Sequence, residues 1–107
     1  MAPDQSDAGR AMEQAEAVLR TETDEVRVTE WRFAPGATTG RHRHGYDYVV
    51  VPLTEGMLKI LSETGETRAA LSPGAAYFRK AGVDHEVVNG GNAPLAFVEI
   101  ELKDRPG

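Results

Sequence analysis

The amino-acid sequence predicts an all-β protein, folded as an antiparallel sandwich or barrel. From Asp24 onward, short segments rich in β-branched and aromatic residues are separated by turn residues at intervals of about eight to twelve positions, a pattern typical of such folds. No segment after residue 24 has helical periodicity, which argues against a βαβ arrangement. The 107 residues suffice for one domain with a single core.

Seven or so strands are expected along the chain. The first, VRVTEWRF (26–33), alternates polar and apolar residues and ends at the Pro35-Gly36 turn. The others are expected at DYVVVPL (47–53), MLKILSE (57–63), ETRAAL (66–71), AAYFRK (75–80), DHEVVN (84–89) and LAFVEIEL (95–102). Glycine, proline and asparagine clusters between them supply the turns.

Residues 1–23 are interpreted as a lead-in, helical or disordered, ahead of a β domain at 24–107. Residues 1–9 are small and polar, and are expected to fray. The segment Ala11–Leu19 contains alanine, methionine, glutamate and glutamine and predicts a short helix. Met12, Ala15 and Leu19 would form its apolar stripe.

The composition argues against several functional classes. The net charge of -5 and the absence of a basic patch argue against nucleic acid as a partner. The chain contains no cysteine, so disulfides and thiolate chemistry are excluded. We find neither a run long enough to span a membrane nor a signal peptide, and we expect a cytoplasmic protein with no membrane partner.

The three histidines of the chain are the most informative residues. His42 and His44 are one residue apart, so both side chains can point to the same face of an extended segment. His85 follows in a later predicted strand. Converging imidazoles are the start of a transition-metal site, although HxH alone would more often be two surface histidines.

Two gapped motifs contain these histidines. The first runs Gly36, five residues, His42-Arg43-His44, then an apolar strand to Gly56. The second runs Gly74, five residues, Lys80-Ala81-Gly82, two residues, His85, three residues, Asn89. Together, and in this order, they resemble the paired motif of the cupin superfamily over roughly Val26 to Lys103. Lys80 stands where that motif usually has proline.

The resemblance implies a single-domain cupin β-barrel, or double-stranded jelly roll, whose inward histidines hold a divalent metal such as Fe, Mn, Ni or Zn. His42, His44 and His85 are the metal ligands that it implies. The motif glycines are expected at turns, where positive φ is needed. An open coordination position would remain for substrate or dioxygen.

The fourth ligand is where the sequence departs from the cupin pattern, because no glutamate follows His44 at the usual spacing. Three interpretations stay open. In the first, the three histidines act alone with water. In the second, Asp47 reaches the metal through a β-bulge. In the third, Tyr48 supplies a phenol as ligand or proton donor. In a regular strand, His44 and Asp47 have opposite parity, which favours the first.

Candidate catalytic residues beyond the histidines are Tyr48, Asp47 and Arg43. Arg41 and Arg43 alternate with the histidines and are expected at the rim, as solvated charges or as partners of a substrate carboxylate. Tyr48 is more simply a packing residue. Asn89 is expected to hold a turn or a strand end.

A narrower resemblance links VRVTEWRFAPGATTGRHRHGYDYVVVPLTEG and FVEIEL to a group of small bacterial cupins that includes a β-alanine-degradation protein. It implies a catabolic setting. The first hypothesis is a metal-dependent enzyme, of dioxygenase or isomerase/lyase type, acting on a small polar, including anionic, organic substrate. The alternatives are a non-catalytic ligand-binding or regulatory module and a metal-free epimerase-like cupin. A homodimer is expected, because long apolar strands need covering.

Overall fold

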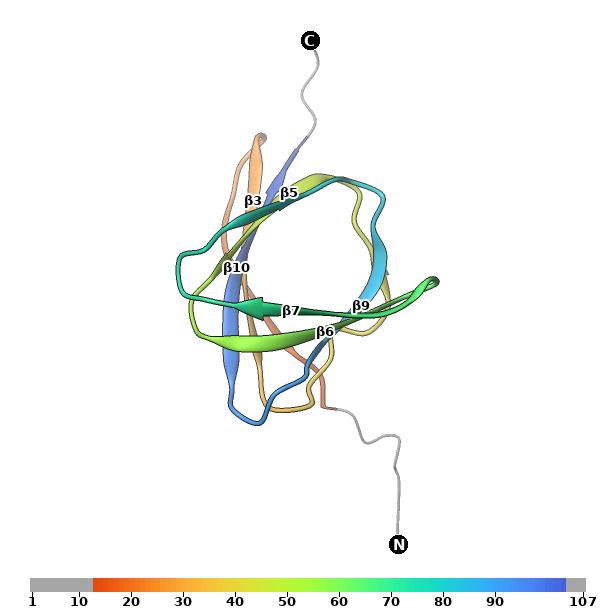
Figure 1. Cartoon of the computed structure of the whole chain (residues 1–107). Helices are drawn as coiled ribbons and strands as arrows, with labels where there is room; N and C mark the ends of the chain where they lie inside the picture. The colour runs from red at the N-terminus through yellow and green to blue at the C-terminus, as the bar shows by residue number, and fades with distance from the viewer. Residues whose placement is uncertain (1–12, 104–107) are drawn as a thin grey trace, which may run out of the picture.

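The structure, a computed structural model, describes residues 13–103. Its nine strands in this range are β2 (Glu16–Glu22), β3 (Val26–Phe33), β4 (His42–Arg43), β5 (Asp47–Pro52), β6 (Gly56–Ser62), β7 (Gly65–Leu71), β8 (Tyr77–Arg79), β9 (Asp84–Asn89) and β10 (Leu95–Leu102). They form one sheet in the order β2-β3-β10-β5-β8 and another in the order β4-β9-β6-β7. In Figure 1 the strands wrap around a common centre, with β3 and β10 on one side and β9 on the other. The predicted all-β cupin fold is confirmed.

The core lies between the two sheets and follows from the alternation of side chains along each strand. On β5, Tyr48 and Val50 point inward, and on β10 Leu95 and Phe97 do the same. The Phe33 ring is 1% exposed, and its centroid lies 5.5 Å from that of Phe97. Each such aromatic side chain contributes about 2 to 3 kcal/mol by burial.

The predicted strands at 26–33, 84–89 and 95–102 are confirmed with the expected bounds. The strands expected at 47–53, 57–63, 66–71 and 75–80 are confirmed with ends shifted by a residue or two. The additional strand β4 is the short segment that contains His42.

The helix predicted at Ala11–Leu19 is wrong over the residues that the structure describes. Glu16–Glu22 is strand β2, which pairs antiparallel with β3, while Ala11 and Met12 lie outside the described residues. Val18 is the only half-buried residue of β2, so no apolar face specifies it. The free backbone edge of β3 recruits this segment and overrides its local helix propensity.

The motif glycines act in two different ways. Gly36, Gly74 and Gly82 have positive φ of 79°, 80° and 96°, as expected for turns. Gly56 instead begins β6 without positive φ, and a Cβ there would lie 2.9 Å from Leu95 Cδ2. Its role is therefore close packing against β10 rather than turn geometry.

Candidate metal centre

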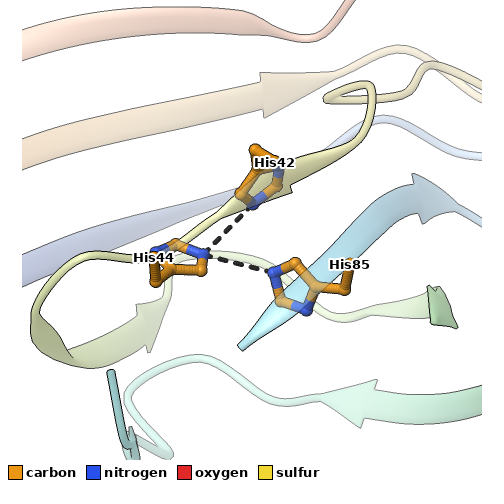
Figure 2. Close-up of side chains that lie close together, drawn as sticks. All are labelled: His42, His44 and His85. Atoms are coloured by element: carbon orange, nitrogen blue, oxygen red, sulfur yellow. Dashed lines mark hydrogen bonds between the residues drawn. The ribbon is translucent and has the colours of Figure 1, made fainter. Parts of the chain in front are cut away.

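Three imidazole rings converge on one point at the inner face of the barrel (Figure 2). His42 Nε2 lies 3.1 Å from His44 Nε2, which lies 3.2 Å from His85 Nε2. The ring planes are steeply inclined to one another, at 76° to 87°. The nitrogens, rather than the ring faces, therefore meet at the centre of the group.

Backbone pairing holds the histidines in this arrangement. His42 on β4 is directly opposite His85 on β9 in the antiparallel ladder. His44 lies just beyond β4, where its N–H donates to the Val83 carbonyl and its carbonyl accepts from the Gly82 N–H, at 2.9 and 2.8 Å. Gly82, which belongs to the second motif, thus fixes a histidine of the first. The second motif therefore helps to position a histidine that belongs to the first.

Hydrogen bonding sets the tautomer of His42. Its Nδ1 lies 3.0 Å from the Gly40 carbonyl oxygen, which can only accept, so Nδ1 carries the hydrogen. The lone pair of the neutral ring is then on Nε2, which faces His44. A backbone carbonyl that fixes the ring in this way is characteristic of metal-ligating histidines.

The spacing of the nitrogens fits a bound divalent ion. Metal–nitrogen bonds of about 2.0–2.1 Å require neighbouring ligand nitrogens to be roughly 2.9 to 3.4 Å apart, and both measured separations lie in that range. Hydrogen bonds alone do not account for both short nitrogen–nitrogen contacts. In either tautomer of His44, its Nε2 contact to His42 or its Nε2 contact to His85 lacks a well-aligned donor. The donor set suits a divalent metal of the first transition series.

Burial keeps the histidines neutral. Desolvation, helped by the nearby His42, lowers the pKa of His44 to about 4, and the same causes lower the pKa of His85 to about 4. Neutral imidazole is the form that binds metals.

A cavity of about 240 Å³ lies beside the triad, between the two sheets. His42 and His85 form part of its wall, and Val50, Leu58 and Phe97 make much of the remainder apolar. A second hollow, of about 320 Å³, reaches His42 and His44 from the side of β3 and β10. A small molecule can therefore approach the histidines within a largely apolar enclosure.

The other residues singled out in the sequence lie in different places. Tyr48 is beside the triad, its ring stacked on His44 with centroids 3.9 Å apart. Burial raises the pKa of Tyr48, so its phenol stays protonated. Arg43 is exposed and borders the second hollow. Asp47 is not in the histidine group, since its Oδ1 accepts a hydrogen bond from the Ala81 N–H at 2.8 Å.

Two residues near the site escaped the sequence analysis. Glu99, on the inner face of β10, places Oε2 3.7 Å from His44 Nε2. The sequence does indicate that Glu99 points inward, because strand alternation puts it on the same face as Leu95 and Phe97. Burial, followed by the charge of Glu101, raises the pKa of Glu99 to about 7. Arg79 lines the cavity of about 240 Å³ between the sheets, and no feature of the sequence distinguished it from a surface arginine.

Asn89, the last residue of the second motif, is structural, as expected. It is 2% exposed, and its Nδ2 donates to the carbonyls of Phe33 and Ala93. Its Oδ1 accepts from the Gly91 N–H. It fixes the turn that leads from β9 into β10.

Comparison with known proteins agrees with this geometry. The family model described as a cupin domain matches residues 29–101. The β-alanine degradation protein BauB of Pseudomonas aeruginosa is 57% identical over 84% of this chain and 95% of its own length. Within residues 13–103, no helix is long and apolar enough to cross a membrane.

Solved structures give the same result. A cupin domain from Bordetella pertussis is 43% identical, with a TM-score of 0.85 over 87% of this chain and 97% of that one. The polyketide cyclase RemF of Streptomyces resistomycificus shares only 21% identity, with a TM-score of 0.66 over 90% of this chain and 72% of that one, and shows the fold alone. With matched motifs, barrel and converging histidines, this chain belongs to the cupin family.

Proposed function

We propose that this cupin is a metal-dependent enzyme that acts on a small, polar, anionic organic substrate in a catabolic pathway. The observation that carries the proposal is the convergence of the three Nε2 atoms of His42, His44 and His85 beside a cavity. The similarity to a β-alanine degradation protein supports the catabolic setting and a small carboxylate as substrate.

The three histidines would hold the ion as neutral ligands. A divalent ion so bound supplies Lewis acidity, which suits either the dioxygenase or the isomerase/lyase class of reaction. The apolar wall of Val50, Leu58 and Phe97 would exclude water and strengthen polar contacts inside the cavity.

Arg79 is suited to bind the anionic end of the substrate. Among the described residues that line the cavity between the sheets, it is the only arginine or lysine. Its guanidinium carbon lies 4.4 Å above the centroid of the Tyr77 ring, which restrains the side chain by a cation–π contact. A guanidinium can form a bidentate pair with a carboxylate. Arg43, on the second hollow, remains a further candidate for the same role.

The experiment is a screen of small carboxylates, β-alanine among them, against metal-loaded and metal-free protein. Binding is read from the rise in melting temperature, and turnover from product formation and oxygen uptake. We expect at least one carboxylate to stabilise and be converted by the loaded protein alone, with the apparent affinity weakened about tenfold or more in Arg79→Gln. Binding without turnover would favour the ligand-binding module, and turnover in the metal-free protein would favour an epimerase-like cupin.

A further inference from the structure

The inner face of β10 places a carboxylate beside His44, the histidine that contacts the other two. Glu99 is 9% exposed and follows Leu95 and Phe97 on the buried side of the strand. Glutamate is almost never buried to this degree without a partner. The position of Glu99 therefore requires a compensating group.

The two oxygens of Glu99 have different surroundings. Oε1 accepts a long hydrogen bond from Trp31 Nε1 at 3.4 Å. Oε2 lies 3.7 Å from Nε2 of His44, the nitrogen that also contacts the Nε2 atoms of His42 and His85. At 3.7 Å, beyond hydrogen-bond range, His44 is not a strong partner of this oxygen. The oxygen that lacks a strong partner is thus the one beside the histidines.

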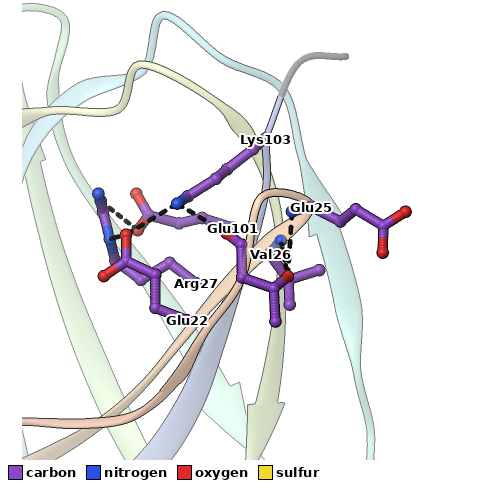
Figure 3. A network of polar contacts seen from close by, with 7 residues as sticks. Glu22, Glu25, Val26, Arg27, Glu101 and Lys103 are labelled. Atoms are coloured by element: carbon purple, nitrogen blue, oxygen red, sulfur yellow. Dashed lines mark hydrogen bonds and ion pairs between the residues drawn. The ribbon is translucent and has the colours of Figure 1, made fainter.

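A second carboxylate on the same face offers a direct comparison. Glu101 also comes within reach of His44, but it is paired with Arg27, whose Nη1 donates to Oε1 at 3.0 Å. Figure 3 shows this pair within a polar network in which Glu22 accepts from both Arg27 and Lys103. Among residues 13–103, Glu99 has no such arginine or lysine partner. The charge of Glu101 is compensated, and that of Glu99 is not.

The first cupin motif of this chain supplies no glutamate at the usual spacing after His44, and the carboxylate of Asp47 accepts the Ala81 N–H. We propose that Glu99, from the last strand, is the carboxylate ligand of the metal held by His42, His44 and His85. The inference rests on the proposed metal-dependent function. Glu99 would take the place of the glutamate that the first motif usually supplies, although it lies on β10, far from that motif in the sequence.

A carboxylate has two consequences for the site. It lowers the net charge of the metal group by one relative to three neutral imidazoles. It also makes the donor set mixed, which favours borderline ions such as Fe(II) or Mn(II) over ions that prefer nitrogen and sulfur alone. A cation beside Glu99 would in turn supply the charge compensation that the protein lacks there.

The test compares wild-type protein with Glu99→Gln and, as a matched control, Glu101→Gln. Each variant removes one negative charge from the same face of β10 and keeps the shape of the side chain. Affinities for Zn²⁺ and Co²⁺ are measured by competition with a chromophoric chelator, and the d–d absorption of the Co²⁺ form is recorded. Circular dichroism checks that each variant is folded.

We expect Glu99→Gln to weaken both affinities by at least about tenfold and to change the Co²⁺ spectrum, with Glu101→Gln within about threefold of wild type. A loss below tenfold, or an unchanged Co²⁺ spectrum, would contradict ligation by Glu99. If Glu99→Gln does not fold, the Co²⁺ form of Glu99→Asp must show a d–d absorption that differs from that of the wild type. Wild-type protein that binds neither ion would instead overturn the proposed function itself.

Discussion

Asp47 shows how the parity of a strand decides the role of a side chain. Val50 and Tyr48 are buried on the inner face of β5, so Asp47 lies on the opposite face. No bulge turns it toward the histidines; its carboxylate instead accepts the Ala81 N–H near the second motif. This placement favours the interpretation in which Asp47 does not bind the metal.

We therefore expect Asp47→Asn to change metal affinity by less than tenfold, or about 1.4 kcal/mol. Asparagine keeps an oxygen that can accept the Ala81 N–H, so the free energy of unfolding should also change by less than about 1 kcal/mol. Metal titration and urea denaturation measure the two quantities. A larger loss of affinity in a folded variant would show that Asp47 is a ligand.

Tyr48 provides a second test at the same scale. Its ring stacks on His44, and its raised pKa keeps the phenol protonated, so it should position the histidine rather than bind the ion. We expect Tyr48→Phe, which keeps the ring, to bind metal within about threefold of wild type, since stacking is preserved. If this variant lost metal as severely as a histidine variant, the phenol would have to be a ligand.

At the scale of the element, strands with a clear two-residue alternation were predictable from the sequence. β9 and β10 have the expected bounds because each buries one face against the core, and β3 has them with Phe33 buried at its end. β2 was not predictable, since its side chains are almost all exposed and only pairing with β3 specifies it. A strand that is stabilised by backbone pairing with a neighbouring strand cannot be recognised from its local sequence.

In the candidate site, too, some residues could be predicted from the sequence and others could not. The histidine triad could be predicted because the spacing of both motifs is local and the resemblance aligned them. Glu99 could not be assigned to the site, although alternation marks it as inward-facing. Its neighbours depend on the register of β10 against β5 and β3, which places it opposite Val50 and Thr29. Register between strands so distant in sequence is a tertiary property.

The start of β6 gives a prediction at this scale. In Gly56→Ala, the new methyl group would lie 2.9 Å from Leu95 Cδ2 and 3.1 Å from Leu95 Cβ, so β6 and β10 must separate slightly. We expect a loss of about 1 to 3 kcal/mol in the free energy of unfolding, as for other overpacked cores. Chemical denaturation measures it.

Gly45→Ala is the matched control, since nothing lies within 4 Å of its added Cβ and its φ is not positive. Its free energy of unfolding should stay within about 0.5 kcal/mol of wild type. Equal effects from the two substitutions would mean that close packing is not the reason for glycine at position 56.

At the scale of the molecule, the outer face of the five-stranded sheet carries a row of apolar side chains. Val28, Ile100 and Val49 are direct neighbours across β3, β10 and β5, and all three are only half-buried. β3 is paired on both sides, so its outer face, rather than its edge, is available for the expected dimer. We expect two copies to cover these rows, since apolar patches of this kind mark interfaces.

Light scattering should therefore give twice the 11.6 kDa chain mass at micromolar concentration. Ile100→Glu should shift the protein toward the monomer, because a charge in the row cannot be buried without a partner. The control is Ala70→Glu, at an exposed position on β7 in the other sheet, which should leave the mass unchanged. A wild-type mass of one chain would refute the dimer.

The central claim is that His42, His44 and His85 form one divalent metal site, and metal content tests it most directly. Protein purified without chelator, then incubated with a divalent metal and desalted, is analysed by elemental mass spectrometry beside His44→Ala. We predict close to one equivalent per chain for the wild type. The variant should hold far less, because two imidazoles leave the ion under-coordinated. Less than about a tenth of an equivalent in folded wild-type protein, or equal content in the variant, would contradict the account.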